Sequence, residues 1–263
     1  MTERDEFLCV KDLTIRFGGL TAVSKLNMTM NRGEILGLIG PNGSGKTTTF
    51  NMLTGLYRPS SGEIWFDGVR IDGQKPHQVA RVGITRTFQN IRLFRQMTVL
   101  ENVLVGRHSR MGQSIFHDVL GGALKRAEER AAREVALDLL RFFGLEQFHS
   151  ATAGTLPYGL QRKLEIVRAL AGEPKLLLLD EPAAGMNDRE TADLKGLVQM
   201  VLERGVSILL VEHHMKLVMD ICHRVVVLNH GEKIAEGSPV EIQRNPLVIE
   251  AYLGRQGSSV AQG

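Results

Sequence analysis

The sequence predicts an α/β fold built around a mostly parallel sheet, and two patterns lead to this prediction. In the second half of the chain, uninterrupted apolar segments alternate with helical segments, as at 175–179, 206–211 and 224–228. Strands that are apolar on both faces are typical of a parallel sheet covered by helices on each side. Near the N-terminus, short β-rich segments separated by glycine and asparagine predict a set of short strands.

The elements of the N-terminal half follow from these patterns. Strands are expected at Phe7–Val10, Leu13–Phe17, Leu26–Met30, Glu34–Ile39, Gly62–Phe66 and Gly83–Phe88. A glycine-rich turn after Ile39 precedes a helix at Thr47–Leu53. From Leu93 to Thr155 the character changes, because apolar residues then recur at three- and four-residue spacing between arginines and glutamates. This spacing predicts amphipathic helices, and therefore a helical insertion in the α/β chain.

The elements of the C-terminal half alternate regularly. Helices are expected at Gln161–Ala171 and Arg189–Glu203, and strands at Lys175–Leu179, Val206–Val211 and Arg224–Leu228. The last ten residues, Gly254–Gly263, are small and polar, which predicts a frayed end.

Composition excludes several classes of protein. The 263 residues are 43% hydrophobic and 23% charged, which is ordinary for a globular protein and excludes disorder, collagen and coiled coil as the whole structure. The net charge of +3 comes without a run of lysines and arginines, so no nucleic-acid partner is expected. Apolar runs of about four residues cannot cross a membrane, which needs about twenty. With a charged N-terminus and two isolated cysteines, Cys9 and Cys222, we expect a cytoplasmic protein without a disulfide framework.

A phosphate-binding loop is the strongest motif. The segment 40–47 fits the pattern G-x-x-x-x-G-K-[ST], and it lies between an apolar strand and a helix, as that pattern requires. Glycines let backbone N–H groups surround phosphates, and the helix N-terminus adds a positive dipole end. Lys46 is expected to reach the β- and γ-phosphates, and the Thr47 hydroxyl to bind Mg²⁺. The predicted ATP-binding residues of this loop are Gly40, Pro41, Asn42, Gly43, Ser44, Gly45, Lys46, Thr47 and Thr48.

Two carboxylates mark the end of another buried strand. Leu176–Leu179 leads directly into Asp180 and Glu181, at the sheet edge where parallel folds bind ligands. Asp180 is expected to hold Mg²⁺, and Glu181 to orient and deprotonate an attacking water. An Asp-Glu-Pro turn without chemistry is the alternative, and the phosphate loop argues against it.

The order of the motifs resembles a known family. The phosphate loop, Gln89 in Thr-Phe-Gln-Asn, the segment 156–162, Asp180-Glu-Pro and His213 are similar to motifs of ATP-binding subunits of ATP-binding-cassette transporters. More narrowly, the segments 180–187, 211–219, 229–237 and 248–254 resemble the LivG-type subunit of branched-chain amino acid importers. The resemblance covers nearly the whole chain. It implies a P-loop NTPase core with a mostly parallel sheet, an N-terminal antiparallel β subdomain and a helical insertion subdomain.

The resemblance also implies roles for single residues. Gln89 resembles the glutamine that touches both Mg²⁺ and the attacking water, and His213 the switch histidine that contacts the γ-phosphate. Phe17 resembles the aromatic residue that stacks on adenine, although a core phenylalanine is nearly as well supported. A signature segment that completes the ATP site of a partner subunit corresponds to Tyr158, Gly159, Leu160 and Gln161.

The chain departs from the family pattern at two positions. The commonest signature begins Leu-Ser-Gly-Gly-Gln, whereas Pro157 stands here in place of the serine and lacks both the hydroxyl and an N–H. Losing one neutral hydrogen bond costs about 1 kcal/mol, so the contact with phosphate is expected to weaken but persist. Asn187 stands where relatives often have aspartate, which retains a polar contact across a dimer interface but removes its charge.

The implied organisation has three parts and several partners. Residues 1–92 and 160–240 form the nucleotide-binding core with its β subdomain, 93–159 the helical subdomain, and 241–263 a C-terminal helix and flexible tail. Two ATPase subunits, paralogous or identical, enclose two ATP molecules and move membrane permeases that work with a periplasmic or extracellular substrate-binding protein. The chain is then expected at the cytoplasmic face of the membrane, as a peripheral protein that hydrolyses ATP with Mg²⁺.

Three other interpretations stay open at this point. The chain resembles ATPases of other transport systems, such as lipopolysaccharide export or amide and urea uptake. A cassette protein of translation or DNA repair usually has two cassettes or a long coiled coil, and neither is present. A regulatory subunit that binds nucleotide without hydrolysis is suggested by Pro157, but Lys46, Asp180, Glu181 and His213 argue against it.

Overall fold

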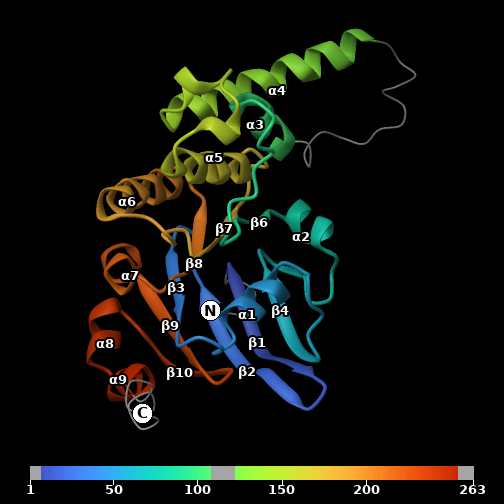
Figure 1. Ribbon diagram of the computed structural model, residues 1–263. Coiled ribbons are helices and arrows are strands. Elements are labelled where there is room, and N and C mark those ends of the chain that lie inside the picture. Colours follow the sequence, from blue (N-terminus) through green and yellow to red (C-terminus); the bar gives the residue numbers. More distant parts are fainter. Residues whose placement is uncertain (1–6, 108–121, 254–263) are drawn as a thin grey trace.

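The computed structural model describes residues 7–107 and 122–253, and its elements form two sheets and a group of helices beside them (Figure 1). The predicted α/β class is confirmed. The predicted frayed end, 254–263, and the charged N-terminus lie outside the described residues. None of the described helices combines the length and the apolar character that crossing a membrane would need.

The smaller sheet is antiparallel and comes from the N-terminal part of the chain. Its strands are β1 (Leu8–Phe17), β2 (Leu20–Met30), β4 (Ser61–Phe66) and β5 (Val69–Arg70), in the order β2-β1-β4-β5. The two strands predicted at 7–10 and 13–17 are one strand, β1, in which the register shifts next to Asp12 at φ +46°. The polar residues of this irregular part resemble a turn in the sequence, although the strand continues through it.

The larger sheet has six strands in the order β10-β9-β3-β8-β7-β6. They are β3 (Ile35–Ile39), β6 (Ile84–Arg86), β7 (Leu176–Asp180), β8 (Ser207–Val211), β9 (Arg224–Asn229) and β10 (Glu232–Gly237). Every neighbouring pair is parallel except β9 and β10. The strand β10 was not predicted, because its residues are polar and half-exposed at the edge of the sheet.

Helices surround the larger sheet. Around the core lie α1 (Lys46–Leu53), α2 (Pro76–Val82), α6 (Asp188–Glu203), α7 (Met215–Ile221), α8 (Pro239–Arg244) and α9 (Pro246–Leu253). Beyond β6 and β7 lies the helical insertion, with α3 (Val99–Arg107), α4 (Gly122–Phe142), two 3₁₀ turns (Glu146–Phe148 and Ala153–Thr155) and α5 (Tyr158–Leu170) (Figure 1). The predicted division between residues 159 and 160 therefore falls inside α5.

Two cores explain why the parallel strands are apolar throughout. Alternate residues of a strand point to opposite faces of its sheet. In β7, Leu177 and Leu179 pack with α3–α7, whereas Leu176 and Leu178 pack with the antiparallel sheet and α1. All four side chains are fully buried. The larger sheet is thus the middle layer, and the carboxyl ends of its parallel strands meet at one edge, which carries the predicted motifs.

Candidate ATP-hydrolysis site

The loop between β3 and α1 requires glycine at two positions. Gly40 has φ +149°, and a Cβ there would lie 2.0 Å from the carbonyl oxygen of Leu228 on β9. Gly45 has φ +104°, and a Cβ there would lie 2.8 Å from the carbonyl oxygen of Ala22. Close backbone approach on both sides therefore fixes the path of the loop.

The polar groups of this loop are arranged to receive an anion. Lys46 is almost fully buried, and its ammonium donates to the carbonyl oxygens of Gly40 at 2.8 Å and Pro41 at 3.0 Å. The buried Ser44 hydroxyl has no hydrogen-bond partner within the described residues. Helix α1 begins after Gly45, which has no side chain to cap the N–H groups of the first turn. The positive end of the helix and these donors together form a phosphate site.

A cleft of about 460 Å³ lies over the loop and contains most of the predicted residues. Its lining comprises Leu20, Thr21, Ala22, Asn42, Gly43, Ser44, Gly45, Lys46, Thr47, Thr48, Glu181, His213 and His230. Four of these, Leu20–Ala22 at the start of β2 and His230 after β9, were not predicted. Nothing in the local sequence pattern distinguishes them, because their place at the cleft depends on how the two sheets pack.

Three predicted catalytic residues meet at this cleft. Glu181 directly follows β7 at φ +46°, a backbone conformation that is unusual for a residue with a side chain. One of its oxygens, Oε1, lies 2.8 Å from His213 Nε2, and the other, Oε2, accepts from Gln89 Nε2 at 2.6 Å. Gln89 and His213, which are 92 and 32 positions from Glu181 in the chain, are thus brought to its carboxylate.

Asp180 has a partner that was missed in the sequence. Its Oδ2 accepts from Arg86 Nη2 at 2.5 Å, and both side chains are buried. The same guanidinium donates to Asn51 Oδ1 on α1 at 2.7 Å and lies over the rings of Phe50 and Phe88. The sequence did contain a signal for this contact, since Arg86 ends a strand of the same sheet and parallel strands end at a common edge.

Phe17 lies at the end of β1, and the described lining of the cleft does not include it. Its ring is 45% exposed and meets Tyr57 edge to face, with 5.3 Å between ring centroids. The stacking role on adenine stays a prediction.

The predicted signature residues lie apart from the cleft, on the first turn of α5. Tyr158 donates its hydroxyl to the carbonyl oxygen of Ala184 at 2.8 Å, and Gln161 donates to the carbonyl oxygen of Leu156 at 2.7 Å. Gly159 and Leu160 line a groove against α6. Among the described residues that line the phosphate cleft, none comes from this turn.

A buried ion pair connects the signature helix, which is α5 with the signature residues on its first turn, to the segment that carries Gln89. Arg162 and Glu165 on α5 are 2.7 Å apart, with side-chain exposures of 0% and 1%. Arg162 also donates to the carbonyl oxygens of Phe88 at 2.7 Å and Gln89 at 2.6 Å. Glu165 accepts from the backbone N–H of Arg92 at 3.0 Å. The helical insertion and Gln89, the glutamine predicted to be catalytic, therefore share one polar core, which the sequence patterns did not predict.

Asn187, the second departure from the family pattern, has a role within its own chain. Its side chain accepts from the N–H of Glu190 at 3.0 Å, and Glu190 accepts from the N–H of Asn187 at 3.0 Å. This reciprocal pair is a capping box at the start of α6. The dimer contact of Asn187 stays a prediction.

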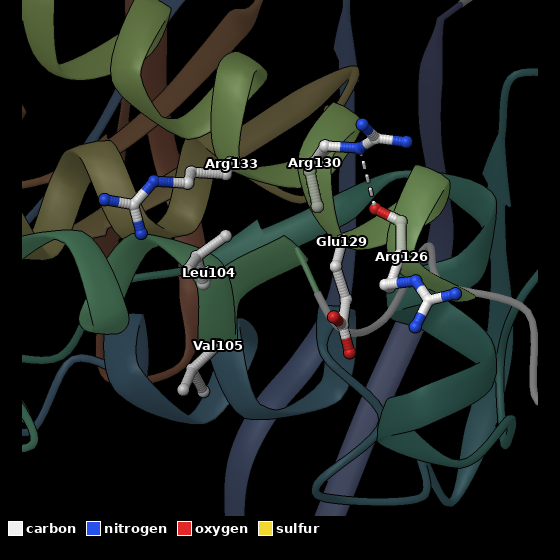
Figure 2. Close-up of a pocket in the computed structure, with 7 residues that line it drawn as sticks. Leu104, Val105, Arg126, Glu129, Arg130 and Arg133 are labelled. Atoms are coloured by element: carbon white, nitrogen blue, oxygen red, sulfur yellow. Dashed lines mark hydrogen bonds between the residues drawn. The ribbon is translucent and has the colours of Figure 1, made fainter. Parts of the chain in front are cut away.

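A second cavity, of about 710 Å³, lies between α3 and α4 (Figure 2). Leu104 and Val105 contribute apolar surface, while arginines and one glutamate come from α4: Arg126, Glu129, Arg130 and Arg133. Arg130 donates through Nε to the carbonyl oxygen of Arg126 at 3.3 Å. This cavity has none of the predicted motif residues in its described lining, so the phosphate cleft is the candidate site.

Comparisons with known proteins identify the family of the chain. The family model described as ABC transporter matches residues 23–184, and the model described as Branched-chain amino acid ATP-binding cassette transporter matches residues 232–257. The chain is 48% identical to the high-affinity branched-chain amino acid transport ATP-binding protein BraF of Pseudomonas aeruginosa, covering 93% of this chain and 96% of BraF. It is 46% identical to LivG of Escherichia coli K12, covering 94% and 97%.

Solved structures give the same result. The ADP conformation of MJ1267, an ATP-binding cassette of an ABC transporter, aligns with a TM-score of 0.83 and 30% identity over 95% of this chain and 99% of that chain. The predicted P-loop NTPase core, antiparallel β subdomain and helical insertion are thereby confirmed, as is the resemblance that the motifs indicated. The chain belongs to the ATP-binding cassette transporter family, among the ATPases of the branched-chain amino acid transport group.

Proposed function

We propose that the chain hydrolyses ATP to drive the import of branched-chain amino acids through membrane permeases. The observation that carries the chemistry is the Glu181 carboxylate, which contacts both Gln89 and His213 beside the phosphate loop. The cargo is supported by the relatives, since proteins named for branched-chain amino acid transport match over more than nine-tenths of their length.

Each residue has a distinct part in the reaction. The loop N–H groups and Lys46 bind the β- and γ-phosphates and stabilise the charge that develops on them. Glu181 accepts a proton from a water that attacks the γ-phosphate in line with the leaving oxygen. Gln89 and His213 hold the Glu181 side chain from both sides, and His213 also contacts the γ-phosphate when ATP is bound.

The residues at this edge fit Mg²⁺. Within the described part of the chain, no cluster of three or more His, Cys, Asp or Glu side chains is placed to hold a metal ion unaided. Mg²⁺ prefers oxygen ligands and is usually held by one or two carboxylates together with substrate phosphates and waters. Thr47, Asp180 and Gln89 supply a hydroxyl, a carboxylate and an amide oxygen for this purpose. When bound, the ion neutralises phosphate charge.

A second ATPase subunit completes the site in this proposal. The signature turn Tyr158–Gln161 is absent from the described lining of the cleft in its own chain, as expected for a group that serves the ATP of a partner. The cassette MJ0796, which is 25% identical with a TM-score of 0.71, has a dimeric structure bound to ADP and Pi. The partner here is a paralogous subunit or a second copy of this chain.

A groove of about 500 Å³ offers a docking site for a permease helix. Core and insertion both contribute to it, and its apolar side chains include Leu56 and Phe94, which are 51% and 47% exposed. Phe88 and Arg92, on either side of the Gln89 segment, also line it. We infer that residues 93–159 move with this groove at the cytoplasmic face of the membrane, while a substrate-binding protein on the other side delivers the cargo.

Lipopolysaccharide export is the second candidate. The chain is 34% identical to LptB of Haemophilus influenzae, the ATP-binding protein of a lipopolysaccharide export system, over 95% of this chain. The higher identity to BraF and LivG favours amino acid import. Gentle affinity purification of the chain from membranes, with mass spectrometry of the co-purifying proteins, separates the candidates. Import predicts two permease subunits of an amino acid transporter and an ATPase, whereas export predicts membrane proteins of the lipopolysaccharide export system. Recovery of soluble proteins alone would remove transport from the proposal.

The Glu181→Gln variant tests the chemistry. The amide has nearly the same shape but cannot accept the proton, so turnover should fall by about 100-fold or more while ATP affinity is retained. Phosphate release measures turnover, and fluorescence of a bound ATP analogue measures affinity. Turnover at the unaltered rate would refute the assignment of Glu181 as general base.

A further inference from the structure

A buried carboxylate next to the site has no part in the mechanism above. Glu212 directly follows β8, and its side chain is only 3% exposed. Neither a lysine nor an arginine pairs with it in the described part of the chain. Its oxygens instead accept three backbone N–H groups, from Ala183 at 2.7 Å, His213 at 2.8 Å and His214 at 3.0 Å.

The three N–H groups belong to the two loops that carry catalytic groups. Ala183 lies two residues after Glu181, and His213 is the switch histidine itself. The ends of β7 and β8 are joined again by the N–H of Glu181, which donates to the carbonyl oxygen of Val211 at 2.8 Å. The buried side chain of Glu212 therefore connects the backbone of His213 with the loop that follows Glu181, and these two residues make the 2.8 Å contact at the site.

The chemistry of a carboxylate suits this task. An ionised carboxylate has only acceptors, about four lone-pair sites on two oxygens, so it can satisfy donors from two directions at once. An amide of the same shape has one acceptor oxygen and an NH₂ group that would face N–H donors. Hydrogen bonds from N–H to a buried charged group are also stronger than those to a neutral one.

We propose that Glu212 is a positioning residue for ATP hydrolysis. It fixes the backbone of the two loops so that the Glu181 carboxylate and the His213 ring keep their contact. This inference rests on the catalytic roles proposed above for Glu181 and His213. Glu212 itself does not touch the reacting atoms. Its loss should therefore affect turnover without affecting the binding of ATP by the phosphate loop.

The test compares Glu212→Gln with a matched control. Glu34 is also a buried glutamate, 8% exposed, but it precedes β3 at the opposite end of the sheet, where it accepts from Asn31 and pairs with Arg224. We expect Glu212→Gln to lower kcat at least 10-fold, with KM for ATP and analogue affinity within about twofold of the unaltered protein. Glu34→Gln should lower the Tm and leave kcat within about twofold.

Amide hydrogen exchange distinguishes local loosening of the two loops from a general loss of stability. Peptides covering 181–187 and 212–216 should exchange faster in Glu212→Gln, while those covering β3 and α1 stay as they were. The variant Glu212→Asp, which retains charge but has a shorter side chain that reaches only one loop, should also lower kcat and serves if the glutamine variant fails to fold.

The outcomes separate this inference from the proposed function. If Glu181→Gln abolishes turnover but both Glu212 variants retain it, Glu212 has no positioning role. An equal fall in kcat for Glu34→Gln would likewise overturn the inference, because general destabilisation would then explain it. If Glu181→Gln itself keeps full turnover, the catalytic assignment fails first.

Discussion

The phosphate cleft and the signature turn are built in different ways, although the reaction proposed above needs both. At the cleft, groups from distant segments converge on one place: the loop 40–48, Gln89, Glu181 and His213. At the signature turn, the polar side chains point back to their own chain, since Tyr158 bonds to Ala184 and Gln161 to Leu156. One region is assembled from distant segments of a single chain, and the other is, in the proposal above, a surface that serves the ATP of a second subunit.

The two regions are nevertheless joined by a polar core. Arg162 on the signature helix holds the carbonyl groups of Phe88 and Gln89, and Glu165 holds the N–H of Arg92. We therefore expect a displacement of α5 to move the Gln89 segment, and through Gln89 the Glu181 carboxylate. In the proposed mechanism, this contact chain links rigid-body movement of the helical insertion to Glu181.

Breaking the buried ion pair between Arg162 and Glu165 should give the largest effect, a loss in the free energy of unfolding. Arg162→Met leaves Glu165 as an uncompensated buried charge and removes donors from two carbonyl groups. Loss of one partner of a buried ion pair costs about 3–5 kcal/mol of the free energy of unfolding. Chemical denaturation of the full chain measures this difference.

The control for this prediction lies in the same insertion. Arg141 pairs with Asp138 at 2.8 Å and Glu146 at 3.1 Å, but the three side chains are at least half exposed. Exposed ion pairs contribute at most about 1 kcal/mol, so Arg141→Met should have little effect. A similar loss of stability in the two variants would contradict the special role of the buried pair.

Two variants distinguish ATP binding by the phosphate loop from completion of the ATP site by a partner subunit. Lys46→Ala removes a charged donor to phosphate, which is worth about 1.5–3 kcal/mol, so ATP affinity should fall roughly 10- to 150-fold. Gly159→Asp should leave affinity nearly unchanged but lower ATPase activity at least 10-fold, since a carboxylate on the signature turn would repel the phosphates of the partner's ATP. Titration with a fluorescent ATP analogue and phosphate release give the two quantities.

The glycine variant is expected to fold, since the nearest atom to a Cβ at this position, Glu190 Oε1, would lie at 3.4 Å, which is an ordinary van der Waals contact. A large loss of ATP affinity in Gly159→Asp would show that the turn acts on the ATP of its own chain. That result would remove the distinction between the two regions.

The sequence predicted the cleft far better than it predicted the connections around it. Gly40, Lys46 and Thr47 are found from sequence because phosphate binding depends on backbone geometry that only certain residues at fixed spacing allow. Glu181 follows from the rule that ligands bind at the carboxyl ends of parallel strands. These requirements are local, or depend on strand order alone.

The residues that connect the motifs needed the packed structure. Arg86, Arg162 and Glu212 are charged residues inside apolar or amphipathic segments, where a solvated position is the ordinary expectation. Each is buried against backbone or side chains far away in the chain, including a contact between positions 74 apart. The strand β10 was missed for a related reason, since its polar residues tolerate an edge and show no strand alternation.

Replacing Pro157 with the serine of the commonest signature should have the smallest effect on stability and ATPase activity. Pro157 is the N-cap of α5, with φ −52° and ψ 151°, and it provides no capping side chain. Serine adopts these angles and caps the helix for about 1 kcal/mol, while the greater freedom of the unfolded chain costs about 0.4–1 kcal/mol. The Tm of Pro157→Ser should therefore hardly change.

In the proposed dimer, the added hydroxyl can also reach the partner's phosphate. One neutral hydrogen bond of about 1 kcal/mol corresponds to a roughly fivefold change in an equilibrium or rate constant. Steady-state ATPase kinetics of the assembled transporter should then show a lower KM or higher kcat by up to that factor. A decrease in turnover would mean that proline at this position is itself part of how the turn meets its partner.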